Sequence, residues 1–417
     1  MSGIDDHSAL SALSALSTAF DDFEAAGREA REWIESTDRF HAYPEHRVQA
    51  YVSLAEARSM AYTMAIAPRT DVPRLHAQTS WHATTSSLGQ NCQDMRYAIV
   101  LLDGARTYRL RGHLGEQRLA LWQVHSHVLG HPESQEIGNY DLTEIAGPDG
   151  TVDILVSGKE QPGPWIRLEP SSPLNFVLVR RILNRITDDY GDLRIEEVED
   201  LSGDAPGAGT RVEEIDADHV AERVTHAAHL LRFLIRDWAI GLYDFYLKTA
   251  GGKNRFSYIP GQQIATDLAG SSSTTYGFCV YELQPDEALI VEWDTVESAY
   301  WSWQLGDVWS NALDFYDFQT TLNSDQAAVD DDGKVRAVVC SSDPGVPNWL
   351  DTRGRREGVV VLRNYKEQSA SVAPTARTVK LADLRDELPA STPTVAPSER
   401  TEALRARRNA YHRAFGD

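Results

Sequence analysis

Apolar residues recur every three to four positions in three parts of this chain, a period typical of amphipathic helices. Helices are therefore predicted at about residues 10–34, 45–66 and 215–249. In the first of them the predicted buried stripe includes Leu13 and Phe20, and in the second it includes Val48, Tyr51 and Tyr62. These stripes predict that the N-terminal helices pack against the rest of the protein.

Between the helices the period changes to two, as in strands that bury one face. Turn sequences such as Asp103-Gly104 and Gly147-Pro-Asp-Gly150 separate the alternating segments, which is typical of antiparallel hairpins. Strands are predicted at residues 97–102, 107–111, 118–129, 151–157, 165–168 and 193–198, and again at 276–283, 288–293, 300–305, 335–340 and 358–363. Residues 176–186 fit either a strand or a helix.

The predicted fold is mainly β with helices (α+β). It comprises two antiparallel β-sandwich or jelly-roll-like units, N-terminal helices and an inter-domain helix. The predicted regions are an N-terminal helical region (1–87), a first sandwich unit (88–200), a linker with the long helix (201–271), a second sandwich unit (272–366), and an extended tail with a C-terminal helix (367–417).

Composition narrows the partners and the compartment. The 40 Lys and Arg residues face 62 Asp and Glu residues, a net charge of −22 that disfavours nucleic acids and anionic membranes. No apolar run approaches the roughly 18 residues of a membrane-spanning helix, and three widely spaced cysteines fit a reducing compartment. We therefore expect a cytoplasmic protein with a small-molecule substrate, and the sequence leaves homo-oligomerisation open.

Several motifs resemble a family of mostly bacterial proteins defined only as a domain of unknown function, DUF1214, often found with a DUF1254 partner. The motifs are Tyr300-Trp-Ser-Trp-Gln-Leu305, Trp309-Ser-Asn-Ala-Leu-Asp314, Gln319-Thr-Thr-Leu-Asn323 with Gln326, Asp343-Pro-Gly-Val-Pro-Asn-Trp-Leu-Asp351, and Arg356-Glu357-Gly358. The resemblance implies two β-sandwich units with helices, from about Leu88 to the end of the chain. The chain departs from the family pattern at residues 90–94 and at Arg355. The resemblance implies no reaction.

The strand at residues 300–305 is rich in aromatic residues. Its period of two puts Trp301 and Trp303 on one face and Tyr300 on the other, and Trp309 follows closely. Such a cluster is typical either of a sandwich core or of a pocket that stacks on a sugar ring or an apolar ligand. Together with Asn348, these aromatic residues are the candidate substrate-binding groups.

A second candidate is the charged loop that follows the proline-rich motif. Asp351, Arg353, Arg356 and Glu357 lie close together in sequence, and Asp314 precedes them. Carboxylates beside guanidiniums suit acid–base chemistry or the clamping of an anion, although such residues also cap turns. These five residues are the candidate catalytic groups, with the carboxylates as acid–base groups and the arginines as charge stabilisers.

Histidines raise the question of a metal. His125 and His127 would share one face of a strand, as half of a metal site whose third ligand could be His113, His131 or Glu133. No spacing specifies that third ligand, so no bound metal is predicted. A metal site that contains His125 and His127 is the alternative. The chain also lacks a Walker loop, a Rossmann fingerprint and a Gly-x-Ser-x-Gly elbow, so no cofactor is expected.

The sequence therefore favours a cofactor-independent enzyme, a hydrolase, lyase or transferase. It would act by acid–base chemistry on a small glycosidic or lipophilic molecule in an aromatic-lined pocket. The alternatives are a non-catalytic carbohydrate- or lipid-binding β-sandwich protein and a cupin-like metal-dependent enzyme. A carboxylate shielded from water at the floor of a pocket would favour the enzyme over the binding protein.

Overall fold

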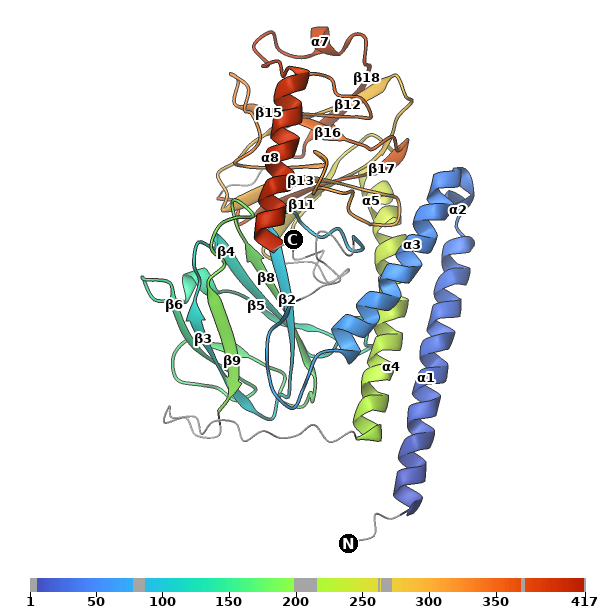
Figure 1. The fold of residues 1–417 in the computed structure, drawn as a ribbon, viewed down its shortest axis with the longest axis vertical. Coiled ribbons are helices and arrows are strands. Elements are labelled where there is room, and N and C mark those ends of the chain that lie inside the picture. The colour runs from blue at the N-terminus through green and yellow to red at the C-terminus, as the bar shows by residue number, and fades with distance from the viewer. Residues whose placement is uncertain are drawn as a thin grey trace.

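The computed structural model describes residues 6–77, 87–198, 216–261, 263, 272–368 and 372–415. Figure 1 shows the long helices standing beside a β-rich body, with a final helix running along the front of that body. The helices are α1 (Asp6–Glu35), α2 (Asp38–Ala42), α3 (Pro44–Ala61) with a π-helical end (Tyr62–Ile66), α4 (Ala217–Phe233), a π-helical segment (Leu234–Leu242), α5 (Tyr243–Ala250), α7 (Leu384–Glu387) and α8 (Pro397–Phe415).

The long central helix has the ends that its sequence predicts. The side chain of Asp216 accepts a hydrogen bond of 2.9 Å from the backbone N–H of Asp218, which caps the first turn of α4. Gly251 ends α5 with a φ of +69°, a left-handed conformation that glycine adopts without a steric penalty. The chain from Ala217 to Ala250 is thus one continuous helical rod.

The predicted buried stripe is wrong for α3 and for the first half of α1, whereas Ala30 and Ile34, which belong to the predicted stripe of α1, are fully buried. Val48 is 67% exposed and Leu13 is 57% exposed, and Phe20, Tyr51 and Tyr62 are also exposed. The residues that these helices bury are mostly small: Ala26 and Ala30 in α1, and Ala50, Ser53, Ala57 and Ala61 in α3. Close packing of α1 and α3 against α4 selects small side chains, whereas a pattern of apolar residues gives most weight to large ones.

Within the described residues, eighteen strands form four sheets, two in each half of the chain. In the first half they are β1 (His76–Ala77), β2 (Met95–Leu102), β3 (Thr107–His113), β4 (Leu119–His125), β5 (Glu136–Asp141), β6 (Thr151–Ser157), β7 (Trp165–Arg167), β8 (Asn175–Ile182) and β9 (Asp192–Glu197). In the second half they are β10 (Ser257–Ile259), β11 (Thr274–Glu282), β12 (Glu287–Asp294), β13 (Tyr300–Gly306), β14 (Thr321–Asn323), β15 (Lys334–Cys340), β16 (Trp349–Asp351), β17 (Glu357–Tyr365) and β18 (Thr375–Lys380).

The predicted fold class is confirmed, because each half is a sandwich of two mostly antiparallel sheets. The first sandwich packs the order β1-β2-β8-β4-β5 against β7-β6-β3-β9, and the second packs β10-β11-β17-β13-β14 against β16-β15-β12-β18. Adding nine to each strand number in the two sheets of the first sandwich gives the strand orders of the second sandwich. The two halves therefore repeat one nine-strand topology, which no sequence period indicated.

The repeat extends to a set of polar side chains. In each half a tyrosine lies opposite an arginine of the neighbouring strand, and that arginine donates to a glutamine two residues along the next strand. The sets are Tyr97, Arg180 and Gln123 in the first half, and Tyr276, Arg363 and Gln304 in the second. The arginine–glutamine distances are 2.6 Å and 2.5 Å, so the equivalence holds at the level of individual atoms.

One apolar core joins the helices to both sandwiches. It contains Ile99 of β2, Phe278 of β11 and Val361 of β17, together with Leu231 of α4 and Met60 of α3. Alternate residues of the same strands face the separate sandwich cores instead. Each five-stranded sheet is therefore covered on both faces, which explains why several of its strands are apolar throughout.

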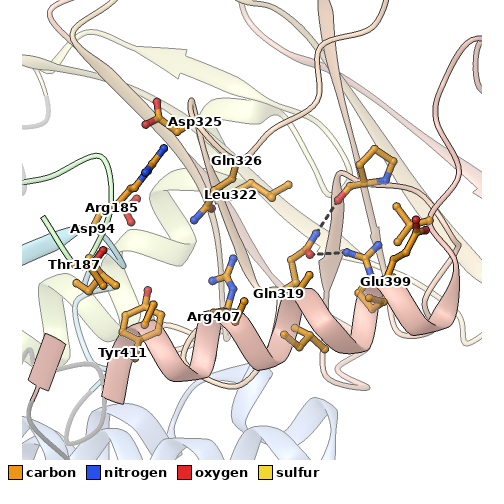
Figure 2. A pocket seen from close by; sticks show the side chains of 18 of the residues that line it. Asp94, Arg185, Thr187, Gln319, Leu322, Asp325, Gln326, Glu399, Arg407 and Tyr411 are labelled. Carbon is orange, nitrogen blue, oxygen red and sulfur yellow. Dashed lines mark hydrogen bonds between the residues drawn. The ribbon is translucent and has the colours of Figure 1, made fainter. Parts of the chain in front are cut away.

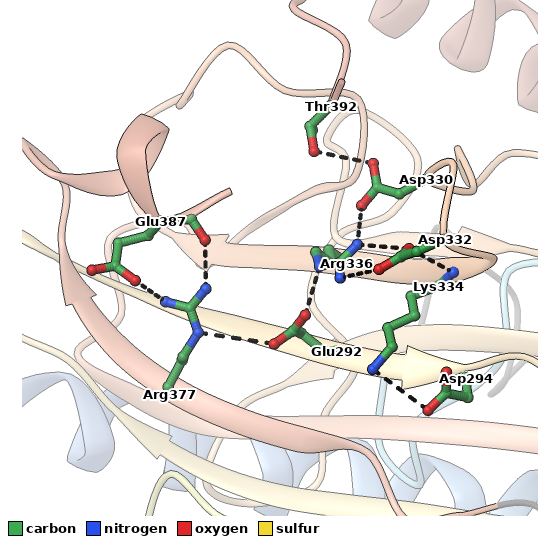
Figure 3. A network of polar contacts seen from close by, with 9 residues as sticks. All are labelled: Glu292, Asp294, Asp330, Asp332, Lys334, Arg336, Arg377, Glu387 and Thr392. Atoms are coloured by element: carbon green, nitrogen blue, oxygen red, sulfur yellow. Dashed lines mark hydrogen bonds and ion pairs between the residues drawn. The ribbon is translucent and has the colours of Figure 1, made fainter. Parts of the chain in front are cut away.

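The tail after residue 367 is more ordered than its composition suggests. β18 pairs antiparallel with β12 and so completes the second four-stranded sheet. Figure 3 shows how charged side chains bind this part of the tail to the sheet. Arg377 of β18 pairs with Glu292 of β12 at 3.9 Å, and the hydroxyl of Thr392 donates to Asp330 Oδ1 at 3.0 Å. The tail is thus part of the second sandwich.

Candidate functional site

A cavity of about 650 Å³ lies beneath α8, and we call it the α8 pocket. Figure 2 shows one face of α8 forming a wall of this cavity. That face carries residues spaced by three and four positions, namely Arg400, Ala403, Leu404, Arg407, Ala410 and Tyr411. The other walls come from residues 184–187 after β8, from Gln319, Leu322 and Gln326 around β14, and from Pro347. The pocket therefore lies where both sandwiches meet the final helix.

Asp94 lines this pocket although its side chain is 2% exposed. Burial raises the pKa of the Asp94 carboxyl to about 6, because the charged form loses its hydration. The phenol of Tyr300 donates to Asp94 Oδ2 at 2.6 Å, and the amide of Asn323 donates to the same atom at 2.7 Å. These two hydrogen bonds limit the upward shift and hold the carboxyl in one orientation.

Arg407 brings a positive charge to the same end of the pocket. Its Nη1 donates to Gln93 Oε1 at 3.1 Å and to the backbone oxygen of Phe315 at 3.0 Å, and its Nη2 donates to the backbone oxygen of Thr321 at 3.1 Å. All of these acceptors are neutral. The guanidinium also lowers the pKa of Asp94, although by less than burial raises it. The half-buried charge of Arg407 can therefore act on a bound molecule.

The outer end of the pocket is held by a second arginine of α8. Arg400 donates to Gln319 Oε1 at 2.5 Å and to Asp343 Oδ2 at 3.0 Å. Gln319, labelled in Figure 2, in turn donates to the backbone oxygens of Pro347 at 2.8 Å and Trp349 at 2.7 Å. Two of the sequence motifs are thereby joined to α8.

The tryptophans of the aromatic strand lie in the core of the second sandwich. Trp301 is 7% exposed and Trp303 is fully buried, and both rings contact Trp293 edge to face, with centroid distances of 5.3 Å and 6.1 Å. Trp309 is buried elsewhere, where its indole N–H donates to the backbone oxygen of His46 at 2.8 Å. None of the three lines the α8 pocket. Tyr300, on the opposite face of β13, reaches the pocket through Asp94.

The charged loop residues each make contacts of their own. Glu357 is buried and bonded to Tyr243 and Lys253, the latter at 2.9 Å, on the side of β17 that meets α5. Asp351 accepts a hydrogen bond of 2.8 Å from the backbone N–H of Arg353, and burial raises the pKa of its carboxyl. The guanidinium of Arg353 covers the ring of Phe318 at 3.3 Å.

The remaining predicted residues hold backbone or aromatic groups in place. Arg356 lies 5.8 Å from the ring centroid of Tyr43. Asp314 accepts a hydrogen bond of 2.9 Å from the backbone N–H of Tyr316. Asn348 both accepts from and donates to the backbone of Ala328, at 2.8 Å and 2.7 Å. The α8 pocket is lined by none of the predicted catalytic residues.

The two predicted metal-binding histidines do not share a strand face. β4 ends at His125, where its register with β5 shifts, so that the alternation does not continue to His127. His125 is 3% exposed, and burial lowers the pKa of its ring to about 3, with a smaller contribution from Arg180. His127 instead gathers with His131 and Glu133, two of the third ligands considered from the sequence.

Sequence reasoning missed Asp94 and Arg407 as site residues. Asp94 ends the segment 90–94, which stands out in the sequence only as a departure from the family pattern, and Arg407 lies in a helix whose sequence indicates only a basic character. These residues are 313 positions apart, and neither has a local motif. One feature of the sequence could have indicated this pocket. Asn323 and Gln326 belong to a family motif, and the sequence pattern assigns neither residue a structural role.

Fold and site define a class of protein, a duplicated β-sandwich with a helix-covered pocket. Residues 265–369 match the family model described as "Protein of unknown function (DUF1214)", which confirms the predicted resemblance over this part of the chain. No curated protein matches the chain in sequence.

Solved structures extend the comparison. An uncharacterised protein from Burkholderia cenocepacia is 25% identical and has a TM-score of 0.78, with alignment over 89% of this chain and 99% of that one. It shares the two-sandwich fold. The VPA0106 protein from Vibrio parahaemolyticus is 11% identical and has a TM-score of 0.44, over 79% of this chain and 97% of that one.

Proposed function

We propose that this protein is an enzyme in which Asp94 performs acid–base chemistry on a small organic molecule bound in the α8 pocket. The observation that carries the proposal is a buried carboxyl, with a pKa of about 6, at the floor of a cavity large enough for a ligand. A group that titrates near neutral pH can both take and return a proton during turnover. Perturbed carboxyls in pockets are typical of catalytic sites.

The residues around Asp94 have complementary roles in this proposal. Tyr300 and Asn323 both donate to Oδ2, which holds the carboxyl in one orientation. Arg407 is bound only to neutral acceptors among the described residues, and would stabilise negative charge that develops on the substrate. Proton transfer would then come from Asp94, just before β2, and charge stabilisation from Arg407 of α8.

The lining supports a substrate that is partly apolar and partly polar. Ile186, Leu322, Leu404 and Tyr411 supply apolar surface, whereas Gln326 and the charged residues can bind oxygen atoms. A cavity of about 650 Å³ suits a ligand the size of a drug or a small glycoside. In this site Tyr411 would be the aromatic group that contacts the ligand.

A cytoplasmic location also belongs to the proposal. All three cysteines are unpaired and buried, as is common in a reducing compartment. Among the described helices, none has the length and apolar character needed to cross a membrane.

The proposal is tested by screening glycosides, terpenoids and small carboxylic acids for turnover and for thermal stabilisation. Asp94→Asn keeps the shape and removes the titrating group, so we expect turnover to fall by about 10²–10⁴-fold with ligand-induced stabilisation retained. Asp325→Asn is the matched control, because Asp325 lines the same pocket but is more exposed. Ligands that bind without turnover in the wild type would favour the non-catalytic binding protein instead.

A further inference from the structure

A second cluster of reactive side chains lies outside the α8 pocket, between the β4–β5 connection and α4. His127, His131 and Glu133 come from the connection, and His226 and His229 come from α4. The ring centroids of His127 and His131 are 4.4 Å apart with nearly parallel planes. His226 and His229 meet His131 edge on, with centroid distances of 5.4 Å and 5.5 Å. Four imidazoles and one carboxylate therefore share one small volume.

The backbone brings these residues together by a close approach at Gly130. This glycine has a φ of +82°, and a Cβ atom there would lie 2.6 Å from the backbone oxygen of His229. The loop can therefore rest directly on α4 only with glycine at this position. The position of the histidine cluster is a consequence of this contact.

Three of the five residues have the arrangement of a ligand set. One ligand atom from each of His127, His131 and Glu133 lies within 4.8 Å of the others. In a tetrahedral zinc site the ligand atoms are about 3.4 Å apart, as metal–ligand bonds of about 2.1 Å require. Rotation of side chains that are only partly buried can close this difference. Closing it would also loosen the hydrogen bond of 3.2 Å from the backbone N–H of Glu133 to His131 Nδ1.

An independent observation points to a ligand at the same place. His226 is 5% exposed, and its Nδ1 has no hydrogen-bond partner. A buried polar atom without a partner is costly, and such atoms in native proteins generally require an explanation. A metal-bound water beside the His131 ring, or the metal itself, would supply the missing partner. His229 also interacts electrostatically with Asp22 and Arg232.

We propose that His127, His131 and Glu133 bind one first-row divalent cation, with Zn²⁺ as the leading candidate, and that His226 completes or supports its coordination. Two histidines and one carboxylate that leave a position open are the ligand set of catalytic zinc sites and of non-haem iron sites. The proposal replaces the expectation of no metal with a site in which His125 takes no part. It does not depend on the function proposed for Asp94, because none of these residues lines the α8 pocket.

The experiment uses full-length protein purified without an affinity tag, with its metal content measured by mass spectrometry. Chelator-treated protein is then titrated with Zn²⁺ against a chromophoric chelator and with Co²⁺ in the visible range. We expect one high-affinity site per chain, a Co²⁺ spectrum of tetrahedral or five-coordinate type, and a higher melting temperature in the presence of Zn²⁺. His127→Ala and His131→Ala should each weaken binding by more than the roughly 10–100-fold typical of a lost supporting residue.

Two further variants keep the test decisive. His113→Ala is the matched control, because His113 is an exposed histidine that binds the backbone oxygen of Asp149 elsewhere in the first sandwich. It should leave Zn²⁺ affinity unchanged. Glu133→Gln removes the exposed carboxylate without disturbing the core, and should weaken Zn²⁺ binding in a protein with unchanged circular dichroism. Wild-type protein that binds neither cation, or binding that survives in His127→Ala and His131→Ala, would overturn the proposal.

Discussion

Asp94 illustrates how a single residue acquires reactivity from its surroundings. As an aspartate before a strand it has no special sequence context, yet burial raises its pKa to about 6. Tyr300 and Asn323 offset only part of the desolvation. The same burial raises the pKa of the Tyr300 phenol well above its usual value, so Tyr300 remains a donor throughout the working pH range.

The pH dependence of stability tests this environment. The folded-state pKa of Asp94 lies above the value of 3.8 in the unfolded chain, so its contribution is fully present below about pH 4 and is lost as the pH rises through about 6. A shift of about two units corresponds to about 3 kcal/mol. We expect the free energy of unfolding of wild type, relative to Asp94→Asn, to fall by about this amount between pH 4 and pH 7, as measured by urea denaturation.

The control for this measurement is Asp325→Asn, whose difference from wild type should be nearly flat over the same range because Asp325 is half-exposed. A flat difference for Asp94→Asn would mean that the carboxyl is hydrated, and would also weaken its proposed acid–base role.

At the scale of elements, β17 shows how a sequence motif can serve packing. Glu357 begins this strand and receives contacts from Tyr243 of α5 and from Lys253, which also pairs with Glu282 at 3.1 Å. Arg39 lies over the ring of Tyr243 at 4.2 Å. The carboxylate therefore joins the central helix to the second sandwich, and its position in a recognised motif follows from this junction.

We expect Glu357→Gln to destabilise the protein by about 2–4 kcal/mol, because it leaves the Lys253 charge without its buried partner. Glu282→Gln is the matched control, since Glu282 contacts the same lysine but is 34% exposed on its side chain, and it should cost less than about 1 kcal/mol. Chemical denaturation measures both. If both variants lost the same small amount of stability and Glu357→Gln also lost ligand binding, Glu357 would instead be a site residue.

At the scale of the whole molecule, the two sandwiches share one core with the helices. The apolar cluster that holds Ile99 and Leu178 of the first sandwich also holds Phe278 and Val361 of the second, with Leu231 of α4 between them in sequence. α8 adds a second connection, since Arg96 of β2 donates to the backbone oxygen of Ala414 at 2.7 Å. Because they share this core, the unfolding of either sandwich would expose apolar side chains of the other to solvent.

We therefore expect a single cooperative unfolding transition in calorimetry, despite the length of 417 residues. Trp303→Ala removes a fully buried indole from the second sandwich core and should cost about 3–5 kcal/mol. It should shift the whole transition to lower temperature. A variant that instead shows two resolved transitions would indicate that the sandwiches unfold independently.

The elements and the fold class could be predicted from the sequence because they depend on local periodicity. Alternation marked β13 and β15, and Asp216 and Gly251 marked the ends of the central helix. Local patterns carry this information because side-chain direction repeats every 2 or 3.6 residues whatever the distant chain does.

Tertiary structure alone decided the rest. Which face of α3 is buried depended on how closely it approaches α4, and the fate of Trp303 depended on Trp293 across the sandwich. The α8 pocket brings together Asp94 and Arg407 from opposite ends of the chain, and the histidine cluster forms because Gly130 lets a loop rest on α4. Burial and electrostatic environment are set by neighbours distant in sequence, so they decide chemistry that no local pattern records.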